Sequence, residues 1–171
     1  EIKEESQLEI IGIESFHSAS IESIFIPKNV KKISKKAFSD CINMKMIELA
    51  PGSQLMHIGK NAFYNTLIKK LFIPSKLKEL EEGWCKSISY LYHITISEDN
   101  NRLKLIDDKL LIGKSDNDEY DTLYFACRDI KKAKIPSTIK YINSFAFADC
   151  CQLKIVEFDE NVDLELINEG A

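Results

Sequence analysis

The sequence predicts a solenoid of the α/β class, in which short coils of chain stack on one another and each coil contains one strand and a return path. Two observations predict this fold. An apolar pattern opens seven successive units at intervals of 22 to 36 residues, and a second apolar pattern follows it in six of them. One such unit buries too little apolar surface to be stable alone, so neighbouring units must stack and share a core.

The opening pattern is a pair of apolar residues with two other residues between them. It recurs as Leu8/Ile11, Val30/Ile33, Leu55/Ile58, Leu77/Leu80, Leu103/Ile106, Ile139/Ile142 and Leu164/Ile167. Phenylalanine then recurs at one position of the unit, as Phe16, Phe38, Phe63 and Phe147. We expect these rings to stack in one column inside the solenoid. In the fourth unit either Trp84 takes over the aromatic role with a shifted backbone or the stack is interrupted, and we favour the first.

The second pattern is an apolar triple whose last two members alternate with an intervening residue, which is typical of a half-buried strand. It recurs as Ile21/Ile24/Ile26, Met44/Ile47/Leu49, Ile68/Leu71/Ile73, Leu91/Ile94/Ile96, Ile130/Ala133/Ile135 and Leu153/Val156/Phe158. A proline follows four of these strands, at positions 27, 51, 74 and 136. Proline cannot donate a ladder hydrogen bond, so it ends the pairing there. The triples therefore predict one strand per unit, and stacked units would pair these strands in parallel.

The fifth unit, residues 103–136, is longer than the others because an extra segment interrupts it. Apolar runs at 110–112 and 123–125 flank the polar stretch 114–121, a pattern that predicts an inserted β-hairpin. Four acidic residues near its tip could gather a calcium ion, but they lack the glycine and terminal glutamate of a calcium-binding loop. We therefore predict a solvated turn and no metal site. The four residues are Asp116, Asp118, Glu119 and Asp121.

Residues 26–41, IPKNVKKISKKAFSDC, and residues 135–150, IPSTIKYINSFAFADC, closely resemble the BspA-like class of leucine-rich repeats. The resemblance covers essentially the whole chain. It implies a leucine-rich-repeat solenoid, wound as a right-handed superhelix with a parallel strand ladder, that forms one domain of about seven coils over residues 1–171. It also implies a cell-surface or secreted protein that adheres to host proteins or other cells, without a fixed catalytic motif. Residues at the two ends indicate a fragment of a longer protein, whose open ends could self-associate.

The outward side chains of the strands form two rows, and we predict that a protein partner binds them. Phe25, Met46 and Phe72 are large apolar side chains expected to face solvent, a pattern typical of interfaces. The candidate partner-binding residues are Phe25, Met46, Glu48, Lys70, Phe72, His93, Thr95, Lys132 and Lys134. A host extracellular-matrix or cell-surface protein is the partner that the resemblance implies. The alternative is a passive structural spacer, in which these rings only pack across strands or against other parts of a longer protein.

Lysines in residues 28–36 offer another candidate site, for a polyanion such as a sulfated glycan. The candidates are Lys31, Lys32, Lys35 and Lys36. Val30, Ile33 and Ala37 point inward in the repeat, so the lysines are what remains on a solvated face, and this is the stronger explanation of the cluster. Nucleic-acid binding is not predicted, because such sites favour arginine and stacking rings and the chain has only Arg102 and Arg128.

Other chemistry is not indicated by the sequence. The three histidines are separated by 40 and 36 residues and have no partner at metal-ligand spacing, so no metal or other cofactor is predicted. Hydrolase and nucleotide-binding motifs are missing, which predicts that the protein is not an enzyme. Apolar runs are too short to span a bilayer. Five cysteines make an odd, irregular set, so we expect mostly reduced, buried thiols, with a Cys150–Cys151 disulfide as the weaker alternative.

Overall fold

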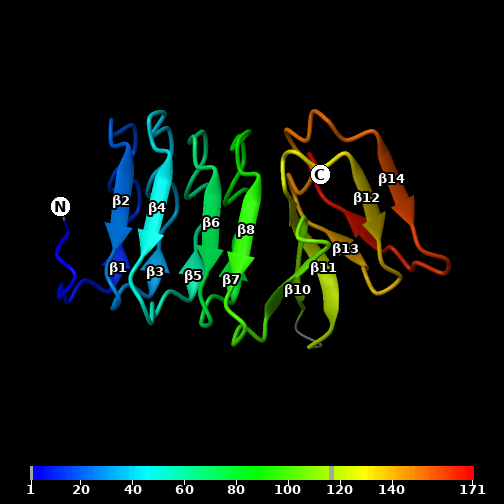
Figure 1. The fold of residues 1–171 in the computed structure, drawn as a ribbon, viewed down its shortest axis with the longest axis horizontal. Helices are drawn as coiled ribbons and strands as arrows, with labels where there is room; N and C mark the ends of the chain where they lie inside the picture. Colours follow the sequence, from blue (N-terminus) through cyan, green and yellow to red (C-terminus); the bar gives the residue numbers. More distant parts are fainter. Residues whose placement is uncertain (1, 116–117) are drawn as a thin grey trace.

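The computed structural model describes residues 2–115 and 118–171. It is an elongated stack of coils with the amino terminus at one end, and its long strands lie side by side in chain order (Figure 1). The predicted solenoid is thereby confirmed. The described residues contain fifteen strands and no helix, so the α/β assignment was too loose. The return segments are turns, because each contains residues with positive φ, such as Lys36 at 54° and Asn61 at 55°, which a right-handed helix does not tolerate.

Short strands arise from the opening apolar pairs. In the first four coils these strands form one parallel sheet, in which the second member of each pair points into the core. They are β1 (Ile10–Ile11), β3 (Lys32–Ile33), β5 (His57–Ile58) and β7 (Glu79–Leu80).

Each long strand contains the last two members of a predicted apolar triple, and the first member precedes the strand. The long strands are β2 (Ser23–Ile26), β4 (Met46–Leu49), β6 (Lys70–Ile73), β8 (His93–Ile96), β12 (Lys132–Ile135) and β14 (Ile155–Phe158). The pairing is parallel, as predicted, but the hydrogen bonds join the strands two by two, as β2–β4, β6–β8 and β12–β14. The face that they form is therefore a series of three strand pairs.

The irregular fifth unit forms the predicted hairpin and extends it to three antiparallel strands. These strands are β9 (Leu103–Ile106), β10 (Leu110–Lys114) and β11 (Tyr120–Ala126). β11 then pairs in parallel with β13 (Tyr141–Ile142), and β13 pairs with β15 (Leu166–Ile167). Of the acidic residues expected at the tip, Asp118 and Glu119 are exposed and Asp121 is buried, while Asp116 lies outside the described residues.

The aromatic column is confirmed for the first three coils. The ring centroids of Phe16 and Phe38 lie 5.2 Å apart and those of Phe38 and Phe63 lie 5.7 Å apart, with 7° between the planes in both pairs. The column then stops. Trp84 keeps the backbone register, since the Phe63 N–H bonds to its carbonyl at 3.0 Å, but its ring packs at 53° against Phe125. The predicted backbone shift at Trp84 is therefore wrong, and the stack is interrupted.

The hairpin divides the core into two apolar clusters. The first contains the phenylalanine column and Trp84, and the second contains Ile135, Ile142 and Ala146. Phe147 packs against the second cluster, so it does not join the column in which the sequence pattern placed it. The stack interruption therefore coincides with the place where the chain inserts β9 to β11 between two regular coils.

A buried arginine joins the two clusters. Arg128 is 2% exposed, and its main-chain N–H bonds to the Leu91 carbonyl of the fourth coil at 3.0 Å. Its guanidinium carbon lies 4.2 Å from the centroid of the Phe125 ring. The guanidinium donates to four carbonyls, those of Ile88 at 3.4 Å, Ala126 at 3.3 Å, Phe145 at 3.4 Å and Ala146 at 2.9 Å. One cation thus satisfies buried carbonyls on both sides of the junction.

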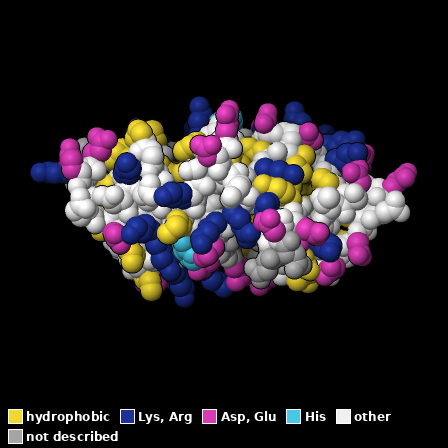
Figure 2. Space-filling view, turned by 90° about the horizontal axis from the view of Figure 1, so that it is seen from below, with side chains coloured by type: hydrophobic (Ala, Val, Ile, Leu, Met, Phe, Trp, Pro, Cys, Tyr) yellow, Lys and Arg dark blue, Asp and Glu magenta, His cyan; other side chains and the backbone are white. Residues whose placement is uncertain are grey.

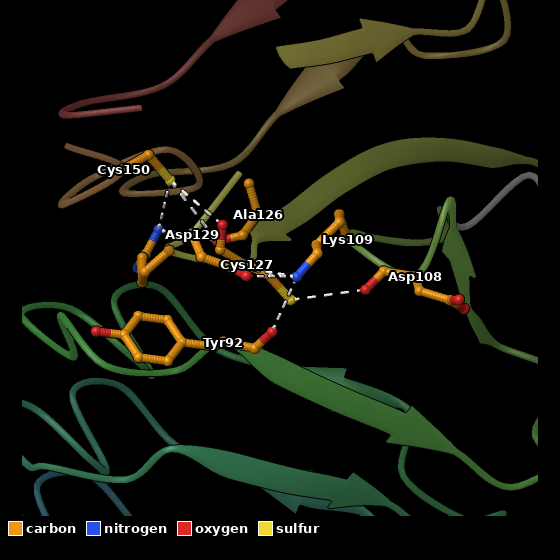
Figure 3. Close-up of polar contacts among 8 residues, drawn as sticks. Tyr92, Asp108, Lys109, Ala126, Cys127, Asp129 and Cys150 are labelled. Atoms are coloured by element: carbon orange, nitrogen blue, oxygen red, sulfur yellow. Dashed lines mark hydrogen bonds and ion pairs between the residues drawn. The ribbon is translucent and has the colours of Figure 1, made fainter. Parts of the chain in front are cut away.

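A second cation, Lys109, contacts both Tyr92 of the fourth coil and Asp129 at the same junction (Figure 3). Its ammonium lies 2.8 Å from both carboxylate oxygens of Asp129 and 3.3 Å from the Tyr92 carbonyl. Nearby, the Lys109 carbonyl accepts the Cys127 N–H at 2.8 Å. The hairpin unit is therefore fixed to the fourth coil by the Lys109 side chain on Tyr92 and by the main-chain bond from Arg128 to Leu91.

All five cysteines are free thiols, as expected, and the Cys150–Cys151 disulfide is not formed. Burial raises the pKa of Cys85 to about 12 and that of Cys127 to about 11. Cys151 is the exposed one of the five. Cys85 and Cys127 are therefore protonated at ordinary pH and do not provide a reactive thiolate.

Iodoacetamide at pH 8 should label Cys151 first and leave Cys85 and Cys127 unlabelled until the protein unfolds. Peptide mass spectrometry with and without urea measures this. The same raised pKa values also predict how the free energy of unfolding depends on pH. It is unchanged below about pH 9, and as the pH rises from there toward the folded-state pKa values it falls by about 1.4 kcal/mol per pH unit for each thiol. Rapid labelling of Cys85 in the folded protein would contradict the buried junction.

Candidate functional site

The two outward rows form as predicted, within each pair of long strands. Register places Ser23 opposite Met46, Phe25 opposite Glu48, Lys70 opposite His93, Phe72 opposite Thr95, Lys132 opposite Ile155, and Lys134 opposite Glu157. Each pair holds its side chains on hydrogen-bonded strands. We call these twelve residues the outward rows.

Large apolar side chains are exposed in the outward rows. Met46 is 53% exposed and Phe72 is 46% exposed, and Ile155 is similarly open. A fully exposed apolar side chain on a rigid strand gains the most from burial by a partner, about 1.5 to 3 kcal/mol. These rows therefore present apolar anchors at positions that the strand pairing fixes.

Phe25 differs from its neighbours in the rows because it is half-buried. It lines a pocket of about 390 Å³ together with Ile2, Ile21 and Met46. Its ring is therefore partly covered, although one side remains available. The pocket gives this end of the face an apolar recess beside the Met46 side chain.

Charged members of the rows are unevenly paired. Lys132 lies 2.8 Å from Glu157, and Lys134 lies 2.7 Å from Asp159, a hydrogen bond that raises the pKa of Lys134. Lys70 and His93 are exposed, and no described residue forms an ion pair with either. The two lysines of β12 are thus paired with carboxylates, whereas Lys70 and His93 of the β6–β8 pair remain available beside Phe72.

The lysine cluster of residues 28–36 is partly paired with carboxylates of the preceding coil. Lys31 lies 2.7 Å from Glu9 and Lys36 lies 3.5 Å from Glu14, while Lys32 and Lys35 have no ion-pair partner in the described chain. Figure 2 shows one face of the molecule, on which both basic and acidic side chains are present, and the ion pairs of Lys31 and Lys36 place carboxylates within the cluster itself. This mixture favours a solvated, mixed-charge surface over a single basic patch.

A cleft that the sequence pattern did not reveal lies between β7 and the hairpin unit. Its volume is about 740 Å³, and His57, Leu80, Arg102, Thr122 and Tyr141 are among the residues that line it. The two ring nitrogens of His57 each face a carboxylate, with Nδ1 2.6 Å from Glu79 and Nε2 2.9 Å from Glu81. The signal that could have indicated this cleft is the 36-residue spacing between the fifth and sixth units.

The described residues offer neither a metal site nor a membrane-spanning helix. No group of three or more histidine, cysteine or acidic side chains is arranged to hold a metal ion. None of the described segments forms a helix long and apolar enough to cross a membrane.

The repeats match a known family over most of the chain. Residues 9–115 and 120–171 match the BspA type leucine rich repeat region, in six copies. The chain belongs to the BspA-type leucine-rich repeat family. Members of such repeat families generally act as modules for protein interaction at surfaces, and they are typically not catalytic. Comparison with curated proteins found no significant sequence match.

Solved structures of bacterial proteins resemble this BspA-type chain. The pneumococcal vaccine antigen PcpA is 26% identical, with a TM-score of 0.84, over 94% of this chain and 39% of that one. A leucine-rich repeat protein from Eubacterium ventriosum is 21% identical, with a TM-score of 0.68, over 90% of this chain and 46% of that one. A leucine rich cell surface protein from Faecalibacterium prausnitzii is 19% identical, with a TM-score of 0.67, over 90% and 52%. The chain thus spans about half or less of the length of these proteins, and the two less similar ones show the shared fold alone.

Proposed function

We propose that this BspA-type solenoid is a non-catalytic adhesion module that binds a protein partner through the outward rows of its long strands. The observation that carries the proposal is the exposure of Phe72 and Met46 on hydrogen-bonded strands. Large apolar side chains at such positions are typical of binding hot spots. The partner is a host extracellular-matrix or cell-surface protein, and the module acts at a cell surface or after secretion. The likeness to a pneumococcal antigen supports that setting.

The β6–β8 pair supplies the centre of the proposed interface. Phe72 stands opposite Thr95, and Lys70 and His93, neither of which forms an ion pair with a described residue, stand opposite each other beside it. A ring at the centre with polar groups around it matches the usual anatomy of a protein interface. The partner should therefore present an apolar pocket for Phe72 with acidic groups at its rim.

Replacing Phe72 with alanine should weaken partner binding by more than about 1 kcal/mol, because the exposed ring loses the surface that the partner would cover. The partner comes from a binding screen against purified matrix and cell-surface proteins, and titration calorimetry then measures the affinities. Tyr90→Ala is the matched control, since Tyr90 is an aromatic of nearly equal exposure, 45%, outside both rows.

Other outcomes separate the competing functions. A passive spacer binds none of the screened proteins, and Phe72→Ala then changes nothing. Polyanion binding through Lys31, Lys32, Lys35 and Lys36 would appear as affinity for heparin that falls steeply between low and moderate salt and disappears when the four lysines are replaced. Equal losses from Phe72→Ala and Tyr90→Ala would contradict recognition through the rows.

A further inference from the structure

The parallel sheet of short strands ends at β7, and no described strand pairs with the outer edge of β7. At each regular step the carbonyl of an inward apolar residue accepts an N–H from the next coil. These bonds run from Ser34 to Ile11, from Gly59 to Ile33, from Glu81 to Ile58, from Asn143 to Leu123 and from Asn168 to Ile142, at 2.8 to 2.9 Å. Leu80 occupies the same position in β7, yet no described residue donates to its carbonyl.

The free main-chain groups of β7 point into the cleft described above. The N–H and C=O of one strand residue face the same edge, so Leu80 presents both a donor and an acceptor beyond β7. Leu80 and Glu81 line one wall of the cleft, and Thr122, Tyr124 and Asn143 line the other. An unpaired strand edge is a template for another extended chain. The volume of about 740 Å³ is typical of a ligand site.

The uncommitted charge in the cleft is positive. The carboxylates of Glu79 and Glu81 already face the two nitrogens of His57, and Glu81 also accepts the Lys60 N–H at 2.6 Å. Of the lining cations, Lys78 is exposed and forms no ion pair with a described residue.

The other two cations of the cleft share a single described carboxylate. Lys114 lies 3.0 Å from Asp118 and Arg102 lies 3.8 Å from it, and Asp118 is itself largely exposed. Three cations thus line the cleft together with two carboxylates that already face His57, so the lining side chains carry one net positive charge, which favours an acidic ligand.

We propose that the cleft binds an extended peptide segment with an acidic side chain, which adds to the free edge of β7 as the missing strand. Its main chain bonds to the N–H and C=O of Leu80, and its carboxylate faces Lys78, Arg102 and Lys114. This is recognition by strand addition, in which main-chain bonds give affinity and side-chain pockets give selectivity. The site is separate from the outward rows.

The test uses a pool of blocked hexapeptides of alternating valine and threonine with one glutamate, added to the ¹⁵N-labelled protein. The largest amide shifts in the nuclear magnetic resonance spectrum should occur at Leu80 and Glu81. Methylating the peptide nitrogens in two alternating sets should weaken binding about tenfold for the set that faces β7 and leave the other set unchanged. Lys78→Gln should weaken binding, whereas Lys69→Gln, which lies outside the cleft, should not.

Four results would overturn strand addition. They are no shift at Leu80 at millimolar peptide, equal effects of the two methylated sets, shifts centred on the outward rows, and tighter binding of a sulfated oligosaccharide than of any peptide in the pool. Phe72→Ala should leave peptide binding unchanged, so failure of the adhesion proposal and failure of this one are distinguishable.

Discussion

Replacing Arg128 with methionine should lower the free energy of unfolding by about 2 to 4 kcal/mol. Methionine keeps an apolar stem against the Phe125 ring but removes the guanidinium donors from the carbonyls of Ile88, Phe145 and Ala146. The Ile88 carbonyl is then buried without a donor from the described chain, which costs about 1 to 3 kcal/mol, whereas the carbonyls of Phe145 and Ala146 lose one donor each but keep main-chain bonds from Ala148 and Ala126. Urea denaturation followed by circular dichroism measures the loss.

The chain supplies its own control for this prediction, because Arg102 is the other arginine. Its side chain is partly exposed and donates to a single carbonyl, that of Lys114. Arg102→Met should therefore cost about 1 kcal/mol or less. Arg128→Lys should restore little, since an ammonium cannot reproduce the planar fork of donors. If the two methionine variants lose equal stability, the buried arginine does not join the two clusters as described.

Replacing Phe38 with alanine should cost about 3 to 5 kcal/mol, with further loss from the two ring contacts. Phe38 is fully buried and stacks on Phe16 on one side and on Phe63 on the other. Its removal opens a cavity that neither neighbouring ring can fill without leaving its own coil. Thermal and urea unfolding both report this change.

Position within the column sets the size of the effect. Phe16 is only half-buried and has one stacked neighbour, so Phe16→Ala should cost clearly less than Phe38→Ala. Phe38→Leu keeps most of the buried volume and should cost about 1.5 kcal/mol or less. Equal losses at positions 16 and 38 would show that the column does not act as a continuous stack.

Apolar periodicity was sufficient to predict the coils, because strand alternation is a local property of the chain. Ile24 and Ile26, the last two members of one triple, lie in β2. The corresponding residues of the next unit lie opposite them in β4. The outward rows follow from the same alternation. The hairpin was also predictable, since the apolar runs at 110–112 and 123–125 flank a polar tip.

The junction was not predictable from local pattern, because its contacts are distant in sequence. Arg128 directly follows the apolar stretch of β11, and this position in the sequence indicates a buried cation. Its carbonyl partner Ile88 lies 40 residues away, so the sequence pattern does not identify the contact. The division of the long strands into three pairs is likewise a property of how the coils stack, which the local sequence pattern does not specify. For the same reason, the open edge at Leu80 became visible only in three dimensions.

Photocrosslinking tests the adhesion proposal most directly, because it locates the partner on the solenoid. A benzophenone amino acid is placed at position 72, in the outward rows, or at position 42, where Ile42 is exposed in a turn outside the strands. After mixing with the partner from the binding screen, we expect crosslinks from position 72 and few from position 42. Crosslinks from position 42, with none from position 72, would contradict recognition through the strand face.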